Sequence, residues 1–207
     1  MTRSHRRGRR TKVARDESGP DGRASVDKLV TITYLEMTSR QDAVPFSEER
    51  RLDVRRAEVP CPELNRSLYV AVGSDWWWHS RLEWDRDRWL AWLDGPEVET
   101  WIGYLAGTPV GYFELEAQPG RQVELVYFGL LPTFIGRGLG AELLASAVAR
   151  AWKVAADRVW VHTCSLDHPR ALANYQARGF RIYDVEERME RLPARRPSLW
   201  APWPLSG

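Results

Sequence analysis

The stretch LLPTFIGRGLGA, residues 130–141, decides the fold, because it joins a run typical of a buried strand to one typical of an amphipathic helix. Three glycines stand at alternate positions in it: Gly136, Gly138 and Gly140. Glycine lets the backbone turn sharply and brings bare N–H groups close to a ligand. The helix that follows points the positive end of its dipole at the same place. The loop and the helix together predict an anion site suited to a pyrophosphate.

Two phosphate loops of other folds fit this stretch less well. A P-loop requires Gly, four residues, and then Gly-Lys followed by Ser or Thr, and the chain contains no such run. The Rossmann fingerprint is formally present as Gly136-x-Gly138-x-x-Ala141. That fold, however, has an acidic residue about 20 residues further on for the ribose. Here the first acid after the next predicted strand, Val159–Thr163, is Asp167, so a dinucleotide fold is disfavoured.

Hydrophobic periodicity predicts one α/β domain around the glycine loop. The predicted strands span residues 29–37, 100–106, 109–117, 123–131, 159–163 and 180–185. The predicted helices span residues 63–72, 85–93, 138–153 and 168–178. Residues 38–60 are polar and contain two prolines, so we expect a loop there, at most with a short helix. The folded domain is expected over residues 28–192, between a disordered basic leader (1–27) and a Pro- and Trp-containing tail (193–207).

The glycine loop resembles the acetyl-CoA motif of the GNAT N-acetyltransferase superfamily, Gln/Arg-x-x-Gly-x-Gly/Ala. In this chain the motif occupies Ile135-Gly136-Arg137-Gly138-Leu139-Gly140, preceded by Leu130-Leu131-Pro132. A second signature of the family, a helix-borne tyrosine before Gly-Phe, is matched by residues 174–180, Asn-Tyr-Gln-Ala-Arg-Gly-Phe. The likeness covers roughly residues 29–187. It implies a mixed, mostly antiparallel central sheet flanked by helices and splayed at the acetyl-CoA site. The chain departs from the family by having Ile135 in place of Gln or Arg.

The resemblance also implies a set of residues that bind acetyl-CoA. In the family, the strand before the loop parts from its neighbour at a bulge, and its free backbone groups pair with pantetheine. Gly129 would allow such a bulge here. The implied cofactor-binding residues are Phe128, Gly129, Leu130, Leu131, Ile135, Gly136, Arg137, Gly138, Leu139, Gly140, Ala141 and His168, the last standing where the family often has Asn.

Acetyl transfer from a thioester to an amine needs a group that protonates the departing thiolate and a way to remove the amine proton. The family motif makes Tyr175 the candidate acid, and a phenol is protonated at neutral pH. Glu124 is the candidate base, with a solvated edge position as an equal alternative. Because many amines need only a water chain, a dedicated base is not required. His162 is expected to be a core histidine and Cys164 a small buried thiol.

Tryptophan is unusually frequent, with 11 residues of this type in the chain. Trp76, Trp77 and Trp78 cannot share one helix face, because successive residues are about 100° apart. We predict that these three bind the substrate, since aromatic faces can hold an ammonium by cation–π contact. Packing against the sheet is the alternative, and so is a homodimer interface.

Composition and charge describe a globular chain with a basic leader. Hydrophobic residues make up 43% and charged residues 28% of the 207 residues. Removing the seven lysines and arginines of residues 1–15, which include no acid, changes the net charge from +2 to −5. Such an arm can bind phosphate backbones by counterion release. No aromatic residue interleaves its arginines, so we expect a solvated leader and disfavour nucleic acid as a partner.

The rest of the composition bounds the setting of the protein. No apolar run approaches the length that spans a bilayer, and the N-terminus lacks the apolar core of a signal peptide. Cys61 and Cys164 are too few for a disulfide scaffold, and their spacing from the histidines matches no metal-ligand pattern. We therefore expect a cytoplasmic protein without a metal.

These observations favour an acetyl-CoA-dependent N-acetyltransferase that acts on a primary amine of a small molecule, or secondarily of a peptide or protein. The alternative from another class is a non-catalytic module that binds acyl-CoA in the same cradle. Tyr175 favours catalysis, because binding alone does not need a phenol at this position.

Overall fold

The computed structural model describes residues 25–46, 48–154 and 157–196, so the expectations for residues 1–24 and 197–207 lie outside the described residues. One seven-stranded sheet has the order β2-β3-β4-β5-β6-β1-β7. All neighbouring strands are antiparallel except β5 and β6. The strands are β1 Ser25–Met37, β2 Asp53–Arg56, β3 Val98–Leu105, β4 Thr108–Gln118, β5 Gln122–Leu130, β6 Arg158–Cys164 and β7 Arg181–Pro193. The predicted mixed, mostly antiparallel sheet is confirmed.

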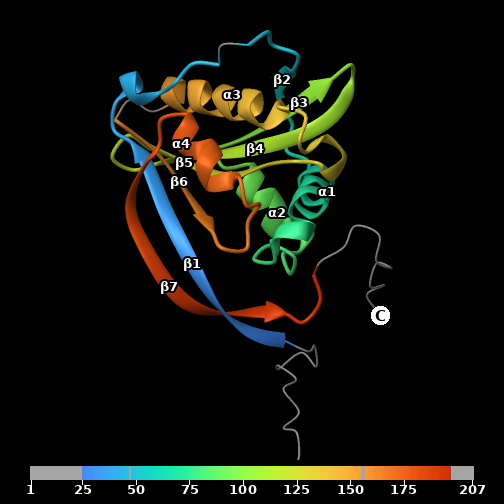
Figure 1. Cartoon of the computed structure of the whole chain (residues 1–207). Helices are drawn as coiled ribbons and strands as arrows, with labels where there is room; N and C mark the ends of the chain where they lie inside the picture. Colours follow the sequence, from blue (N-terminus) through green and yellow to red (C-terminus); the bar gives the residue numbers. More distant parts are fainter. Residues whose placement is uncertain (1–24, 47, 155–156, 197–207) are drawn as a thin grey trace, which may run out of the picture.

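Helices cover both faces of the sheet (Figure 1). They are α1 Pro62–Gly73, α2 Arg86–Leu93, α3 Leu139–Val154 and α4 Ala171–Ala177, with short 3-10 helices η1 Arg40–Asp42, η2 Ser74–Trp76 and η3 Pro132–Phe134. Asp85 caps α2 by accepting a hydrogen bond from the Arg88 backbone N–H at 2.8 Å. Within the described part of the chain, no helix combines the length and the apolar content that crossing a bilayer requires.

The main core lies between α3 and one face of the sheet. Leu143, Leu144 and Ala147 on the inner stripe of α3 are almost fully buried against apolar residues of β1, β4, β5 and β6. Alternation along the strands sends their other side chains to the opposite face, where α1 packs against Ile102 and Tyr112. The sheet therefore has two apolar faces, each covered by helices.

The sheet is splayed between β5 and β6. These strands pair in parallel only from Gln122–Arg158 to Glu124–Trp160. Beyond that point both strands continue, to Leu130 and Cys164, with no further pairing between them in the described residues. The separation opens the middle of the sheet, as the resemblance implied.

A β-bulge on β5 sits where the two strands part. Glu114 of β4 lies opposite Tyr127, but its neighbour Leu115 lies opposite Leu125, so Val126 is an extra residue on β5. An extra residue bends its strand and increases the local twist. The bulge therefore turns the second half of β5 away from β6.

The predicted bulge at Gly129 is wrong. Gly129 lies in register opposite Tyr112. A Cβ atom added to Gly129 would clash with Cγ1 of Val72 on α1. Glycine is needed here because α1 packs directly against the strand, and any side chain would displace the helix.

Strands β1 and β7 form a long curved ribbon that runs down one side of the molecule (Figure 1). They pair from Ser25–Pro193 to Glu36–Arg181. Residues 25–27 thus belong to the sheet, although we expected them in the disordered leader. The last strand also continues well past its predicted end at Val185. The second half of β7 is rich in charged residues, as is common in an exposed edge strand. These charges interrupt the apolar alternation from which a strand is predicted.

Three further differences from the prediction are local. Residues 53–56, expected in a loop, form β2 by pairing with β3. The β3–β4 turn is Ala106-Gly107, one residue earlier than predicted, and both residues have positive φ (50° and 83°). Helix α4 begins at Ala171 rather than His168. Strand β2 depends on its pairing with β3, which a short window of sequence does not contain, and the other two differences are shifts of an element's boundary.

Candidate active site

A cavity of about 1010 Å³ opens where β5 and β6 part. Its lining comes from the glycine loop, α4, the segment around η2, the second half of β5 and His162 of β6. The cavity thus connects the predicted cofactor loop with the tryptophan segment.

The glycine loop has the backbone that its sequence predicts. Gly136 and Gly138 have φ of 82° and 78°, a region that glycine adopts without strain, and α3 begins at the next residue. The predicted cofactor residues that line the cavity are Phe128, Gly129, Leu130, Ile135, Gly136, Gly138, Gly140, Ala141 and His168. The start of α3 therefore faces a space large enough for a ligand, beside the strand that the bulge has turned aside.

Three predicted cofactor residues point elsewhere. The side chain of Leu139 is buried in the core, at 1% exposure. Leu131 packs on the cluster of Ile102 and Tyr112 under α1. The guanidinium of Arg137 lies 5.4 Å from the ring centre of Phe134, outside the set of cavity-lining residues. Any contact of these three with a cofactor would be through the backbone.

Arg51, which the sequence analysis did not single out, reaches the glycine loop from the segment before β2. Its Nη2 donates a hydrogen bond to the Arg137 carbonyl oxygen at 3.1 Å and would lie 3.3 Å from a Cβ atom on Gly138. Buried Glu142, in the first turn of α3, accepts hydrogen bonds from the backbone N–H groups of Arg51 and Leu52 at 2.8 and 2.7 Å. Glu142 thus anchors a distant segment to the start of the helix and places a cation beside the loop.

Tyr175 lies on α4 and lines the cavity. Its ring stands edge-on between those of Phe128 and Phe180, with centroid distances of 6.1 and 5.9 Å. Burial, together with the charge of Asp167, raises the pKa of Tyr175 well above its ordinary value. The hydroxyl is therefore protonated at neutral pH.

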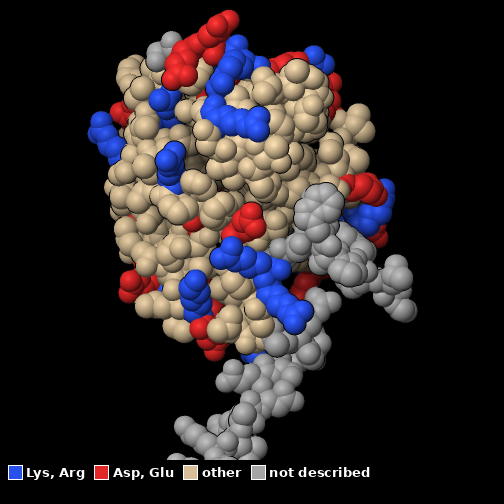
Figure 2. All heavy atoms as spheres, turned by 45° about the vertical axis from the view of Figure 1, so that its right-hand side comes forward, with Lys and Arg blue, Asp and Glu red and all other residues tan. Residues whose placement is uncertain are grey.

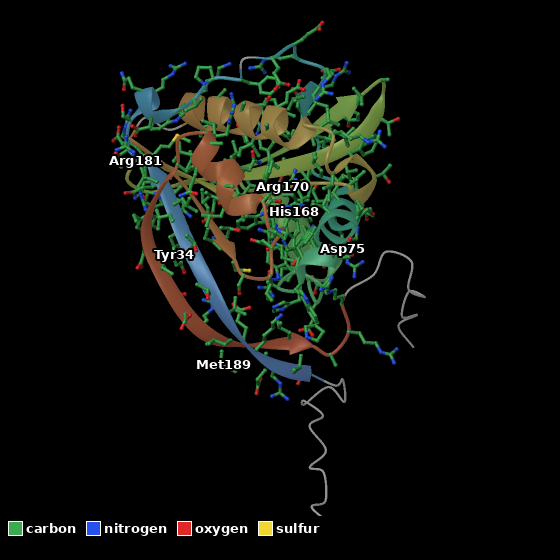
Figure 3. The ribbon with its side chains drawn as sticks, viewed as in Figure 1. Tyr34, Asp75, His168, Arg170, Arg181 and Met189 are labelled. Atoms are coloured by element: carbon green, nitrogen blue, oxygen red, sulfur yellow. The ribbon has the colours of Figure 1, made fainter. Side chains whose placement is uncertain are left out.

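His168 and Trp76 join α4 to the tryptophan segment. Their rings meet edge-on with centroids 4.9 Å apart. Figure 3 shows His168 and Arg170 just before α4, beside the segment that carries Asp75. His168 therefore closes one wall of the cavity and braces η2.

The three consecutive tryptophans all line the cavity but have different partners. Trp77, with a left-handed φ of 60°, packs on the apolar cluster of Ile32 and Leu192, which lie on β1 and β7. Trp78 packs on Tyr127, with ring centroids 4.8 Å apart, and on α1 at Gly73, where a Cβ atom would clash with its indole. Each tryptophan thus also has a structural contact.

The other tryptophans of this region enclose a cation of the protein itself. The guanidinium of Arg81 lies 4.5 and 4.4 Å from the ring centres of Trp84 and Trp92. Its Nη1 is 2.7 Å from Oε1 of Glu114, and both side chains are at most 5% exposed. Burial raises the pKa of Glu114, and the neighbouring Arg81 opposes that shift. Glu114 therefore forms an internal ion pair with Arg81. Glu116 lies on the same face of β4.

Glu124 and His162 face each other across the point where β5 and β6 part. His162 Nδ1 lies 3.4 Å from Glu124 Oε1. The side chain of His162 is 45% exposed and lines the cavity, whereas that of Glu124 is 11% exposed and lies behind it. The expectation of a core histidine is therefore wrong, because the splay uncovers this position of β6.

Cys164 follows His162 on the same face of β6 and also lines the cavity. Burial, with a smaller contribution from Asp167, raises the pKa of the Cys164 thiol to about 11. The thiol is uncharged at neutral pH. Cys164 was expected to be a small buried thiol, whereas the structure leaves it partly buried on the cavity wall. Its raised pKa disfavours a nucleophilic role.

One side of the molecule carries both signs of charge. Figure 2 shows acidic and basic side chains interspersed with large uncharged areas on the side that it displays. Nucleic-acid-binding surfaces typically carry a continuous basic face. The displayed side is therefore unlike such a surface.

Comparison with protein families matches residues 59–180 to the acetyltransferase (GNAT) family. A search of curated proteins found none that matches this chain. Similar solved structures include a GCN5-related N-acetyltransferase from Sphaerobacter thermophilus (TM-score 0.59, 18% identity, 83% of this chain and 53% of that one). Another is from Kribbella flavida (TM-score 0.56, 17% identity, 81% and 59%). This chain spans less than two thirds of the length of either.

A shorter similar structure is a Bacillus subtilis acetyltransferase in complex with CoA. Its TM-score is 0.50 at 22% identity, and the match covers 64% of this chain and 78% of that one. At these identities the structures show a shared fold, while the family match spans more than half of the chain. This chain therefore belongs to the GNAT acetyltransferase family, whose chemistry is acyl transfer from an acyl-CoA.

Proposed function

We propose that the protein is an acetyl-CoA-dependent N-acetyltransferase that acts on a primary amine of a small molecule by direct attack in a ternary complex. One observation carries this proposal. A single cavity is lined by the glycine loop at the start of α3, by aromatic residues around Trp78 and by Tyr175 of α4, which is protonated at neutral pH. Direct transfer requires both substrates in one space beside an acid.

The donor end suits a CoA thioester. The backbone N–H groups around Gly136–Gly140 and the dipole of α3 favour the pyrophosphate. Backbone groups of β5 beyond Glu124 face a gap where β6 no longer pairs, which leaves them free for the amides of pantetheine. The similar Bacillus subtilis acetyltransferase was solved with CoA, which supports a CoA ligand here. We propose acetyl as the acyl group.

Ile135 stands where the family motif has Gln or Arg, and Arg51 supplies a cation beside the loop instead. Arg51→Gln should raise the Kd for acetyl-CoA about tenfold, because one charge-assisted contact to phosphate is lost. Arg50→Gln is the matched control. Arg50 lies next to Arg51 and bonds Ser146 Oγ at 3.4 Å instead of the loop. Isothermal titration calorimetry of both variants, repeated with phosphate-free S-acetylpantetheine, measures the effect.

Only acetyl-CoA should distinguish the two variants, since S-acetylpantetheine carries no phosphate. Equal Kd values of Arg51→Gln and the wild type for acetyl-CoA would remove Arg51 from the site. If the wild type itself did not bind acetyl-CoA, the donor assignment would fail.

The acceptor end suits an amine of modest size with apolar or cationic character. Trp76, Trp78 and Tyr127 give it aromatic walls, which can hold an ammonium group or stack a ring. Ser80 Oγ and Tyr127 OH lie 3.0 Å apart and offer a polar group on the same wall. A structurally similar aminoglycoside acetyltransferase from a soil metagenome was solved with sisomicin (TM-score 0.50, 13% identity, 62% of this chain and 86% of that one). It supports a small-molecule amine as the acceptor class.

A further inference from the structure

His162 and Glu124 form a pair at the apex of the cavity. The last paired position of β5 and β6 is Glu124–Trp160, and His162 lies two residues further along β6. At this point the sheet first opens enough to admit a ligand between the strands. A thioester held along β5 past the Val126 bulge would bring its carbonyl close to the same place.

A chain of hydrogen bonds fixes the carboxylate of Glu124. Trp160 Nε1 donates to Gln118 Oε1 at 3.0 Å, and Gln118 Nε2 donates to Glu124 Oε2 at 2.9 Å. The three residues come from β6, β4 and β5, so the sheet itself sets their positions. Oε1 is left as the oxygen that faces His162.

This arrangement favours one tautomer of His162. The carboxylate of Glu124 stabilises the ring proton on Nδ1, the nitrogen 3.4 Å from its Oε1. The other nitrogen, Nε2, then keeps its lone pair and can accept a proton from a group in the cavity. The Nδ1–Oε1 separation of 3.4 Å is within the range expected of a catalytic pair before substrate binds.

The carboxylates near the cavity other than Glu124 have stronger partners. Glu190 Oε1 is 2.7 Å from Arg188 Nη2. Asp167 Oδ2 accepts hydrogen bonds from Thr163 Oγ1 and the Cys164 backbone N–H, at 2.7 and 3.0 Å. Glu114 is buried with Arg81.

Two histidines that line the cavity lie beside a carboxylate. His162 Nδ1 lies 3.4 Å from Glu124 Oε1, and His79 Nε2 lies 3.9 Å from Glu190 Oε2. Arg188 is the closer partner of Glu190, so the His162–Glu124 pair is the shorter one and the one without a competing arginine among the ion pairs of the described residues.

We propose that His162 is the general base of the acetyl transfer and that Glu124 is a positioning residue that orients its ring. The proposal rests on the proposed N-acetyltransferase function. It revises the expectation that Glu124 itself removes the proton, because Glu124 lies behind His162, outside the set of residues that line the cavity.

The step balances with these two residues and Tyr175. The neutral amine forms a C–N bond to the thioester carbonyl carbon, and the C–S bond breaks. The nitrogen gives one proton to His162 Nε2, and Tyr175 gives one proton to the departing thiolate. Proton exchange with water then restores both side chains, so the net change is the transfer of one acetyl group and one proton.

His162→Gln should lower kcat/KM about 100-fold and leave the Kd for acetyl-CoA and the melting temperature unchanged. The pH profile supplies a second readout. In the wild type, kcat/KM calculated for the neutral form of the amine should fall on the acidic side because a protonated imidazole cannot accept a proton, and the variant should lose this fall. The ionisable groups that face His162 are Glu124 on β5, Tyr34 on β1, which donates to Glu186 of β7, and uncharged Cys164.

Chemical rescue separates a base from a packing residue. His162→Ala leaves space open to the cavity, so added imidazole should restore part of its activity in proportion to the concentration of the neutral form. A side chain that served only to pack against Tyr34 would not be replaced in this way.

The role of Glu124 is tested against Glu116, which lies directly opposite it on β4 and also accepts a hydrogen bond from Gln118 Nε2, at 3.0 Å. Glu124→Gln should lower kcat/KM, by less than His162→Gln, and shift the acidic fall of the profile. Glu116→Gln should leave both unchanged. Full activity of both His162 variants in an enzyme that acetylates amines would overturn the proposal alone, whereas an inactive wild type would overturn the proposed function.

Discussion

Gly138→Asp should weaken acetyl-CoA binding about 100-fold, equivalent to roughly 3 kcal/mol. Two effects act together at this position. Gly138 has a φ of 78°, which an L-residue adopts only with strain, and an aspartate would place a negative charge where the pyrophosphate is expected. Like charges in contact cost several kcal/mol, so repulsion dominates.

The matched control is Gly107→Asp. Gly107, in the β3–β4 turn, has a similar φ of 83°, and no atom lies within 4 Å of an added Cβ. The control therefore introduces the same strain and the same charge far from the loop. Calorimetry should show wild-type affinity for Gly107→Asp and greatly reduced affinity for Gly138→Asp. An unchanged Kd in the second variant would show that the phosphates bind elsewhere.

Tyr175→Phe should lower kcat by about 100-fold while the Kd for acetyl-CoA stays within a factor of about two. Phenylalanine keeps the ring between Phe128 and Phe180, so the fold is retained and only the hydroxyl is lost. Because the pKa of Tyr175 is raised, the phenol stays protonated across the neutral and mildly alkaline range. Its own ionisation should therefore cause no loss of kcat as the pH rises through that range.

Tyr183→Phe controls for the loss of a tyrosine hydroxyl in general. Tyr183 is 44% exposed on β7, outside the set of cavity-lining residues. Steady-state kinetics should show wild-type kcat for Tyr183→Phe. Equal turnover of Tyr175→Phe and the wild type would remove the acid role, and water would then protonate the thiolate.

The parts of the site that the sequence predicted are those encoded within a short segment. The glycine loop and Tyr175 each belong to a local motif. The helix or strand that positions each motif can be predicted from the neighbouring residues. The α3 helix follows in the same way from its apolar stripe. Local motifs therefore identified residues that line the cavity.

The parts that were missed depend on contacts between distant segments. Arg51 reaches the glycine loop because Glu142, about 90 positions away, accepts two of its segment's backbone N–H groups. The bulge falls at Val126 because of the register between β4 and β5. No residue type marks either event in the sequence. His162 was misassigned for the same reason, since its exposure depends on where β5 leaves β6.

The tryptophan segment shows a second limit of sequence reasoning. A cluster of aromatic residues suggests a ligand cation, but Trp84 and Trp92 enclose Arg81 of the chain itself. The sequence places an arginine among these tryptophans without showing that it folds inward to meet Glu114 on β4. Trp76–Trp78 do line the cavity, as predicted for substrate-binding residues, and their contact with an acceptor stays a prediction.

Amine-dependent release of free thiol from acetyl-CoA, with the N-acetylated product identified by mass spectrometry, tests the proposed transfer most directly. The panel should contain aliphatic, aromatic and polycationic primary amines and a lysine peptide, each compared with an amine-free control. We predict that at least one small amine is acetylated and that Tyr175→Phe strongly reduces the rate. If the protein binds acetyl-CoA and no amine raises thiol release above the control, the enzyme assignment is contradicted and the chain is an acyl-CoA-binding module.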